Sequence, residues 1–374
     1  MREIFVIKNG QVFHSEKKVF MNERIYIYNE KIIAKDEVKN TDNIIEWDAK
    51  GKYVSPGFID IHVHVFENYA KLGINADKIG IEQGVTTVVD AGSSGWIDFK
   101  KFKEMIINKS TTEVLSFLNI SSTGLVGGTN ELSSPDKLMK MEEWLKIKAD
   151  EPAILGLKAR MSNSVVGNQG ISPLIHAKTL ARETNVPVMV HIGNPPPKLT
   201  EIFPLLEKGD IVTHAFHGKK EGILDGDGIL LPEAKAALER GIIFDLGHGT
   251  SSFSFETIKR FKRRYSYPFT ISTDIYDRNF THPVRSLMTT INKLLAIGYE
   301  LKDLLQAVTI LPAQCLSLVG YGVLNPGNKA DITVFDVANV EEELVDSIGN
   351  KIISCRNLIP YATWKNGKIV YEKS

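Results

Sequence analysis

Five side chains of metal-binding type and one lysine stand near the ends of short apolar runs in this sequence. The first two form a His-Val-His triplet at the end of residues 54–64, and the others follow runs such as 188–190 and 211–213. These runs are rich in β-branched residues, which is typical of buried strands. Imidazole and carboxylate groups are preferred ligands of zinc and similar divalent cations. The six residues are His62, His64, Lys158, His191, His214 and Asp274.

The histidine pair is the clearest single signal. His62 and His64 are two residues apart, so on a strand both rings point to the same side and can chelate one cation. Packing in a protein core is the alternative explanation for any one histidine. That alternative does not account for further metal-binding types at equivalent strand ends, so the pattern predicts a metal site.

Lys158 discriminates between kinds of metal site. A protonated lysine is unfavourable beside divalent cations, because like charges disfavour the charged form. A neutral amine that captures carbon dioxide becomes a carbamate, an N6-carboxylated lysine whose two oxygens can bridge two metals. A salt-bridging lysine at the rim of the fold is the alternative. In the two-metal arrangement, the first cation is held by His62, His64, the carbamate and Asp274, and the second by the carbamate, His191 and His214.

The elements that must position these side chains alternate between strands and helices. Amphipathic stretches at 135–148, 172–184 and 232–240 have helical length, and eight strands alternate with helices over about 270 residues, which predicts a (β/α)8 TIM barrel of the α/β class. Strand ends in such a barrel meet on one face, where active sites are built. Loop 121–134 follows the third strand on that face and is either a lid or a plain surface loop. The predicted strands are 57–61, 86–91, 114–120, 154–159, 187–191, 211–214, 242–246 and 269–274.

Both ends of the chain contain short strands and tight turns. Turns at Asn9-Gly10 and Asn366-Gly367 have the composition of hairpin turns. Neither end is long enough to bury a sheet face alone. We therefore expect one small β-sandwich domain built from residues 1–54 and 322–374, beside a barrel over residues 55–321.

The composition excludes several classes of partner. The chain has 374 residues, with 45 basic and 45 acidic side chains and no net charge. This balance gives no reason to expect nucleic acid or an anionic membrane as partner, and no apolar run is long enough for a transmembrane helix. The two cysteines, Cys315 and Cys355, form no disulfide framework. A cytoplasmic enzyme of a small-molecule substrate is the expectation.

The metal pattern and its flanking stretches resemble the amidohydrolase superfamily, in the branch with a binuclear centre and a carboxylated lysine. Residues 56–64 and 327–336 look like its signatures where barrel and β domain join. Residues 156–162, 191–193, 245–250 and 272–276 resemble the amidohydrolase/deacetylase metallohydrolases, whose members often carry dihydroorotase or adenine deaminase labels. The resemblance implies a hydrolase with two divalent ions, zinc first among them, and a homo-oligomer as the default assembly.

The ligand set predicts a mechanism for amide or ester hydrolysis. Two cations would lower the pKa of a bridging water, so that hydroxide forms near neutral pH. One cation would polarise the substrate carbonyl while the metal-bridging hydroxide attacks it. Asp274 is the expected catalytic residue, which accepts the proton of the water and then delivers it to the leaving group.

The absence of residues that are typical of other amidohydrolases narrows the range of expected substrates. Dihydroorotases usually carry an arginine where this chain has Phe66, and mononuclear deaminases have a glutamate where it has Asn194. Sugar-phosphate deacetylases often use a glutamate at the end of the third strand, and residues 119–122 contain none. Deacetylation of a small acyl acid remains the leading hypothesis. A dihydroorotase-like or hydantoinase-like cyclic-amide hydrolase is the alternative, followed by a nucleobase deaminase and a non-catalytic scaffold.

Four further residues are expected to contact substrate. Arg160 lies two residues after Lys158 and could pair with a substrate carboxylate. His248 ends the seventh strand between two glycines, and Tyr276 and Arg278 follow Asp274. A rim salt bridge is the alternative role for Arg160, and surface positions are the alternative for Tyr276 and Arg278.

Overall fold

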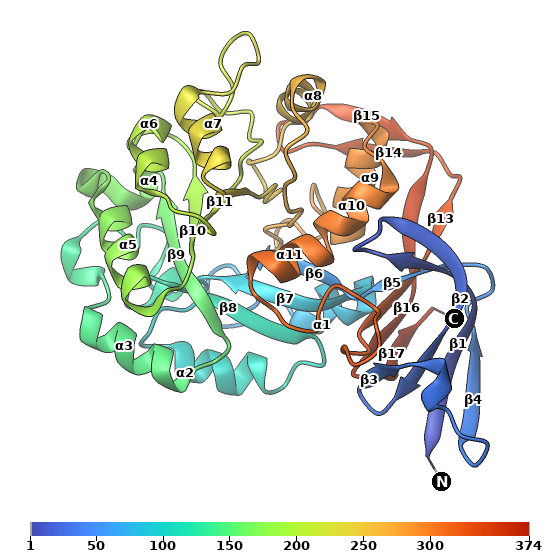
Figure 1. Cartoon of the computed structure of the whole chain (residues 1–374). Helices are drawn as coiled ribbons and strands as arrows, with labels where there is room; N and C mark the ends of the chain where they lie inside the picture. The colour runs from blue at the N-terminus through green and yellow to red at the C-terminus, as the bar shows by residue number, and fades with distance from the viewer. Residues whose placement is uncertain (1, 374) are drawn as a thin grey trace.

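Seven parallel strands form the wall of the barrel in the computed structural model, which describes residues 2–373 (Figure 1). Each strand pairs with the next one along the chain, as expected when helices connect parallel neighbours. Seven of the eight predicted strands are therefore present. They are β6 (Phe58–Val63), β7 (Val85–Ala91), β8 (Glu113–Asn119), β9 (Ile154–Met161), β10 (Val188–Ile192), β11 (Ile211–Thr213) and β12 (Ile243–Phe244).

The eighth predicted strand, residues 269–274, closes the barrel as an irregular segment. Thr270 forms a single parallel bridge to Asp245, the residue after β12, and Ile275, the residue after the segment, forms one to Val63 of β6. The backbone N–H of Asp274 donates to the carbonyl of His62 at 2.7 Å. Asp274 itself has a left-handed backbone with φ of 49°, which interrupts regular pairing at the point where the site is built.

Helices cover the outside of the barrel. The predicted helix 172–184 is α5 (Ser172–Thr184), whose buried Leu174, Ala177 and Ala181 recur at helical spacing against the wall. Among residues 2–373, no helix has the length and apolar character needed to cross a membrane. The other helices are α1 (Ala76–Ile79), α2 (Phe99–Phe102), α3 (Met141–Asp150), α4 (Asn163–Val166), α6 (Leu199–Ile202), α7 (Pro232–Glu239), α8 (Phe255–Arg264), α9 (Leu287–Ala296), α10 (Leu301–Ala307) and α11 (Ile310–Cys315).

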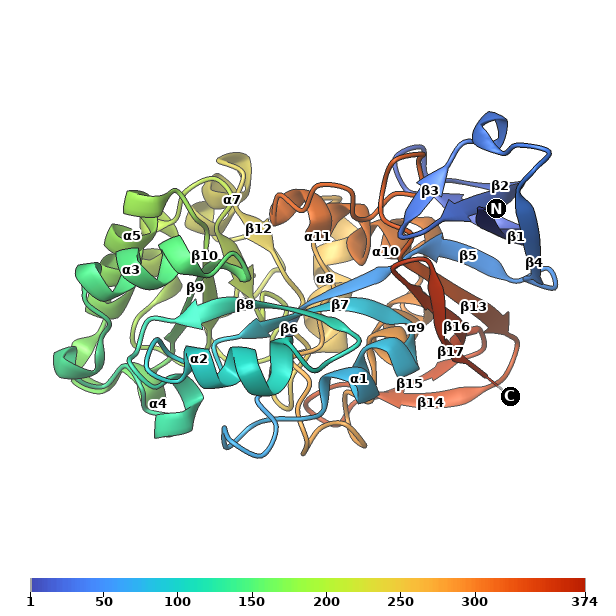
Figure 2. The ribbon, with the colours of Figure 1, turned by 90° about the horizontal axis from the view of Figure 1, so that it is seen from below.

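Strands from both termini lie side by side in a second sheet at one flank of the barrel (Figures 1 and 2). Strand β1 pairs with β4 through residues 3–8 and with β5 through residues 11–12, and its register with β2 shifts between Ile7 and Gly10, so one half of the sheet includes β4 and the other includes β5. Trp47 and Trp364 meet across the two halves, with ring centroids 5.9 Å apart. Its strands are β1 (Glu3–His14), β2 (Val19–Tyr28), β3 (Lys31–Ile33), β4 (Asn43–Asp48), β5 (Tyr53–Pro56), β13 (Ile332–Ala338), β16 (Asn357–Lys365) and β17 (Lys368–Glu372).

One hairpin from the C-terminal segment lies apart from this sheet. Among residues 2–373, strands β14 (Glu342–Val345) and β15 (Lys351–Ser354) pair only with each other. Their turn reaches the barrel loops: Asp346 accepts the backbone N–H of Phe255 at 3.0 Å, and the Ser347 hydroxyl donates to the Gly249 carbonyl at 2.8 Å. The C-terminal segment thus also buttresses the loop that follows β12.

Candidate active site

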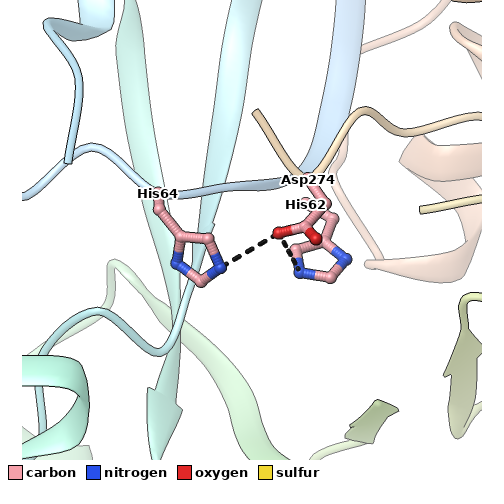
Figure 3. A group of neighbouring side chains, drawn as sticks. All are labelled: His62, His64 and Asp274. Atoms are coloured by element: carbon pink, nitrogen blue, oxygen red, sulfur yellow. Dashed lines mark ion pairs between the residues drawn. The ribbon is translucent and has the colours of Figure 1, made fainter. Parts of the chain in front are cut away.

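Two histidines at the end of β6 and one aspartate from the closing segment form the centre of the site. Figure 3 shows both rings directed at the carboxylate of Asp274. Its Oδ1 atom lies 3.3 Å from Nε2 of His62 and 3.1 Å from Nε2 of His64. All three could hold one cation, as the His-x-His spacing predicts.

The Nδ1 nitrogens of three of the rings contact neighbouring polar groups. Nδ1 of His62 lies 2.8 Å from the Thr213 hydroxyl, and Nδ1 of His64 lies 2.9 Å from the Ser93 hydroxyl. Nδ1 of His214 lies 2.5 Å from the carbonyl of Gly247 and donates to it. Such contacts fix ring orientation and leave the other nitrogen free to bind a metal.

A second group of ligand types lies against the first. Nε2 of His214 is 2.8 Å from Nδ1 of His191 and 3.8 Å from Oδ2 of Asp274. Lys158 Nζ is 3.1 Å from Nε2 of His62. The fold therefore brings together all six side chains that the sequence analysis singled out, although they come from five different segments of the chain.

Burial controls the charge of these groups. Desolvation lowers the pKa of His62 and His191 well below the ordinary value and that of His214 to about 3, so these three rings are neutral. Burial alone would raise the pKa of Asp274, but the hydrogen bond with His64 and the electrostatic effects of His214 and Lys158 lower it overall. Neutral imidazoles around an ionised carboxylate are a donor set that fits divalent cations.

Lys158 is fully buried at the floor of this site. Its amine contacts His62 and the sulfur of Met189, at 3.1 and 3.3 Å, and no carboxylate within residues 2–373 forms an ion pair with it. Desolvation is the main cause that lowers the pKa of Lys158 to about 7. The rim salt bridge that was the alternative is therefore not formed.

A cavity of about 470 Å³ opens above the ligand groups. This size suits a small-molecule substrate. Arg160 and Tyr276, two of the four expected substrate contacts, line it together with Asn194, Lys219 and Thr250. The hydroxyls of Tyr276 and Thr250 are 2.5 Å apart.

The other two expected contacts lie elsewhere. His248 is buried behind the cavity wall, where Lys293 donates to its Nε2 at 2.8 Å and its Nδ1 donates to the Gly249 carbonyl at 2.9 Å. Arg278 is exposed and is not among the residues that line the cavity. His248 faces inward because the glycine on each side has a left-handed backbone, a conformation that the alternation of a regular strand does not anticipate.

The loop after β8 contributes a residue that the sequence analysis missed. Glu131 is buried, and both of its carboxylate oxygens lie 3.1 Å from Nη1 of Arg160. Lys219, in the loop after β11, is a second missed residue of the cavity. Neither follows a strand directly, so no periodic signal marked them.

Comparison with known proteins gives a family. A model of the "Amidohydrolase family" matches residues 53–370. A "Deacetylase" of Enterococcus faecalis (strain ATCC 700802 / V583) is 38% identical over 372 residues, covering 97% of this chain and 98% of that protein. A crystal structure of an adenine deaminase has a TM-score of 0.91 at 37% identity and covers 99% of both chains. A dihydroorotase structure has a TM-score of 0.90 at 32% identity, covering 99% of this chain and 98% of its own.

These relatives have three activity names on closely similar folds, so similarity alone does not select the substrate. The family model and the relatives agree on the class of protein and confirm the predicted resemblance and the barrel fold. This chain belongs to the amidohydrolase family and is a hydrolytic enzyme that acts on small molecules.

Proposed function

We propose that this chain is a binuclear metal-dependent deacetylase that removes an acetyl group from a small acyl acid. The observation that carries the proposal is the convergence of four imidazoles, one carboxylate and one buried lysine below a single cavity. The similarity to a deacetylase over almost the whole chain supports the choice of reaction. The metal ligands would be His62, His64, Lys158, His191, His214 and Asp274, with zinc as the cation.

Lys158 would serve as a carbamate. Its amine nitrogen would form a bond to carbon dioxide and release one proton, which leaves an anion with two oxygens between the two halves of the ligand set. Support comes from geometry: the amine is buried beside His62 without a carboxylate partner among the described residues. An uncompensated ammonium is costly in such a place, and a carbamate would pair with cations.

Asp274 would move the proton during the reaction. Bound divalent ions would supply a water of lowered pKa and would polarise the acyl carbonyl. Asp274 would accept a proton from the attacking water and later donate it to the leaving alcohol or amine. Tyr276, whose hydroxyl lies in the cavity wall, donates to the carbonyl oxygen as its negative charge develops.

Two positions favour an open-chain acyl substrate over a cyclic amide or a nucleobase. Phe66 stands where a dihydroorotase carries arginine. It is fully buried and packs on Phe102, with ring centroids 5.0 Å apart, and it is not among the residues that line the cavity. Asn194 lines the cavity where mononuclear deaminases have a glutamate for proton transfer. The similarity to a dihydroorotase structure keeps cyclic-amide hydrolysis as the second candidate.

We also propose that the enzyme works in the reducing cytoplasm, since Cys315 and Cys355 are both free thiols.

The substrate proposal is tested with metal-reconstituted protein in bicarbonate buffer. The panel compares acetyl esters of 2-hydroxy acids and N-acetyl amino acids of both hands with dihydroorotate and hydantoins. We expect turnover of the acetyl compounds. Turnover of the cyclic compounds alone would contradict deacetylation and favour the second candidate.

A further inference from the structure

Lys219 gives the cavity a positive charge that the proposed chemistry does not use. It lies in the loop after β11 and lines the same cavity as His191 and Asp274. We infer that Lys219 binds a carboxylate of the substrate and so selects acyl acids over neutral acyl compounds. This inference deepens the proposed function and rests on it for the identity of the reaction.

The positive charge of Arg160, which also lines the cavity, is already paired with a carboxylate. Arg160 is held by both carboxylate oxygens of Glu131 at 3.1 Å, and the Glu131 side chain is only 1% exposed. A buried pair of this kind is costly to separate. Arg160 is therefore a poorer partner for an incoming anion than the sequence alone suggested.

Lys219 is not neutralised in this way. Within residues 2–373, no carboxylate forms an ion pair with its ammonium group, and Asp274 is the acidic group whose charge acts on it. Partial burial strips water from Lys219, and Arg160 adds repulsion, so the pKa of Lys219 is lowered. A substrate carboxylate would replace the missing water and relieve both effects.

The backbone around Lys219 is anchored to the metal-ligand strand. The N–H of Lys219 donates to Nδ1 of His217 at 3.1 Å, and the N–H of His217 donates to the carbonyl of His214 at 3.2 Å. The His217 ring is 1% exposed, and Thr257 donates to its carbonyl at 3.1 Å. These contacts hold the start of the Lys219 side chain at a fixed place relative to the ligand groups.

The shared cavity limits the class of substrate. The acyl carbonyl has to reach the ligand groups at the cavity floor, and the carboxylate has to reach Lys219 in the wall. A cavity of about 470 Å³ limits the molecule to a small one. A 2-acyloxy acid or an N-acyl amino acid meets these conditions, because its carboxylate lies a few bonds from the scissile group.

The test compares Lys219→Met and Lys219→Arg with the wild type, using Lys220→Met as the matched control at an exposed neighbour outside the cavity lining. Each protein, loaded with zinc in bicarbonate, is offered acetyl-lactate and the neutral amide of acetyl-lactate. Binding of lactate and lactamide, which cannot be deacetylated, is measured by calorimetry. We expect Lys219→Met to lower kcat/KM for the acid about 10- to 100-fold. The value of kcat/KM for the amide should stay within about threefold of the wild-type value. Lys219→Arg should restore part of the loss.

The two readouts separate this inference from the proposed function. If the wild type prefers lactate to lactamide and Lys219→Met abolishes that preference, Lys219 binds carboxylate even where no acetyl compound is hydrolysed. In that case only deacetylation fails. If Lys219→Met weakens the acid and the amide equally, or changes neither, the inference is overturned whatever the enzyme hydrolyses.

Discussion

At the scale of single residues, Asp274 combines an unusual backbone with a central position. Its φ of 49° is in the left-handed region, as is the φ of 66° at His214. Such conformations cost about 1–3 kcal/mol each and persist where the surrounding structure enforces them. Here the enforcing contacts are the hydrogen bond from Asp274 N–H to His62 and the one from the Asn279 amide to the Asp274 carbonyl, at 2.7 and 2.8 Å.

Replacement of Asp274 by asparagine tests its role in proton transfer. Asp274→Asn keeps the size of the side chain and one oxygen ligand but cannot accept the proton, so we expect kcat to fall about 10²- to 10⁴-fold with most metal retained. Kinetics on an acetylated acid and metal analysis of the same sample measure both effects. Asp277→Asn, at an exposed neighbour, is the control. Wild-type turnover in Asp274→Asn would refute this role.

Sequence patterns predicted the metal-ligand types of this site but not every residue of its cavity. The ligand types were identifiable because metal binding requires particular side chains, and these follow strands directly. Glu131 and Lys219 come from long loops, and their side chains reach the cavity only through the tertiary packing of those loops. Their contribution depends on contacts far away in the sequence, which no local pattern contains.

At the scale of elements, the loop after β12 shapes the space beside the catalytic carboxylate. Gly249 has a φ of 53°, and a Cβ atom at this position would lie 2.5 Å from Oδ2 of Asp274. Ser347 of the β14–β15 hairpin donates to the Gly249 carbonyl, and Lys293 of α9 donates to the adjacent His248. The contacts from Ser347 and Lys293 therefore fix the loop on the side away from the cavity. The missing side chain of Gly249 leaves room for Asp274.

Replacement of Gly249 by alanine tests this element. We expect Gly249→Ala to lower kcat at least tenfold, because the added methyl group displaces Asp274, and to destabilise the fold by about 1–2 kcal/mol through its left-handed backbone. Steady-state kinetics and thermal unfolding measure the two effects. Gly226→Ala, where an added Cβ meets nothing within 4 Å, should change neither. Unchanged kcat in Gly249→Ala would show that the loop does not restrict Asp274.

At the scale of the whole molecule, an ion cluster joins the barrel to the terminal sheet. Glu113, at the start of β8, accepts from Lys365 of β16 at 2.8 Å and from Lys329 at 3.0 Å. Burial alone would raise the pKa of Glu113, but Lys365, Tyr321 and Lys329 outweigh it and lower that pKa to about 2. Because the folded pKa is below the ordinary 4.5, Glu113 stabilises the fold above about pH 4.5, and this contribution is lost as the pH falls toward 2.

Urea unfolding of metal-free protein measures this contribution. We expect Glu113→Gln to lower the free energy of unfolding at pH 7 by about 1–3 kcal/mol, since it leaves two buried or half-buried lysines without their shared carboxylate. The difference from the wild type should shrink as the pH is lowered from 5 toward 2. Glu104→Gln, at an exposed position, is the control. A difference that stays constant with pH would contradict this assignment.

The sequence predicted the strands and helices of the barrel, but not the contacts that close the barrel and join it to the C-terminal hairpin. Alternating apolar runs and amphipathic stretches indicated the barrel, since both periods are local properties of the chain. The closing segment around Asp274 is irregular because a left-handed residue interrupts it. The β14–β15 hairpin lies against the barrel through Asp346 and Ser347, and such long-range contacts leave no periodic trace in the sequence.

The most direct test of the two-metal deacetylase is a metal titration of the metal-free protein. Zinc is added in bicarbonate buffer while the hydrolysis of an acetylated 2-hydroxy acid is followed. The proposal predicts no turnover without metal and a rise of the turnover rate to a plateau at two equivalents of zinc per chain. The turnover rate at the plateau should fall when carbon dioxide is excluded. A plateau at one equivalent, or hydrolysis by the metal-free protein, would contradict it.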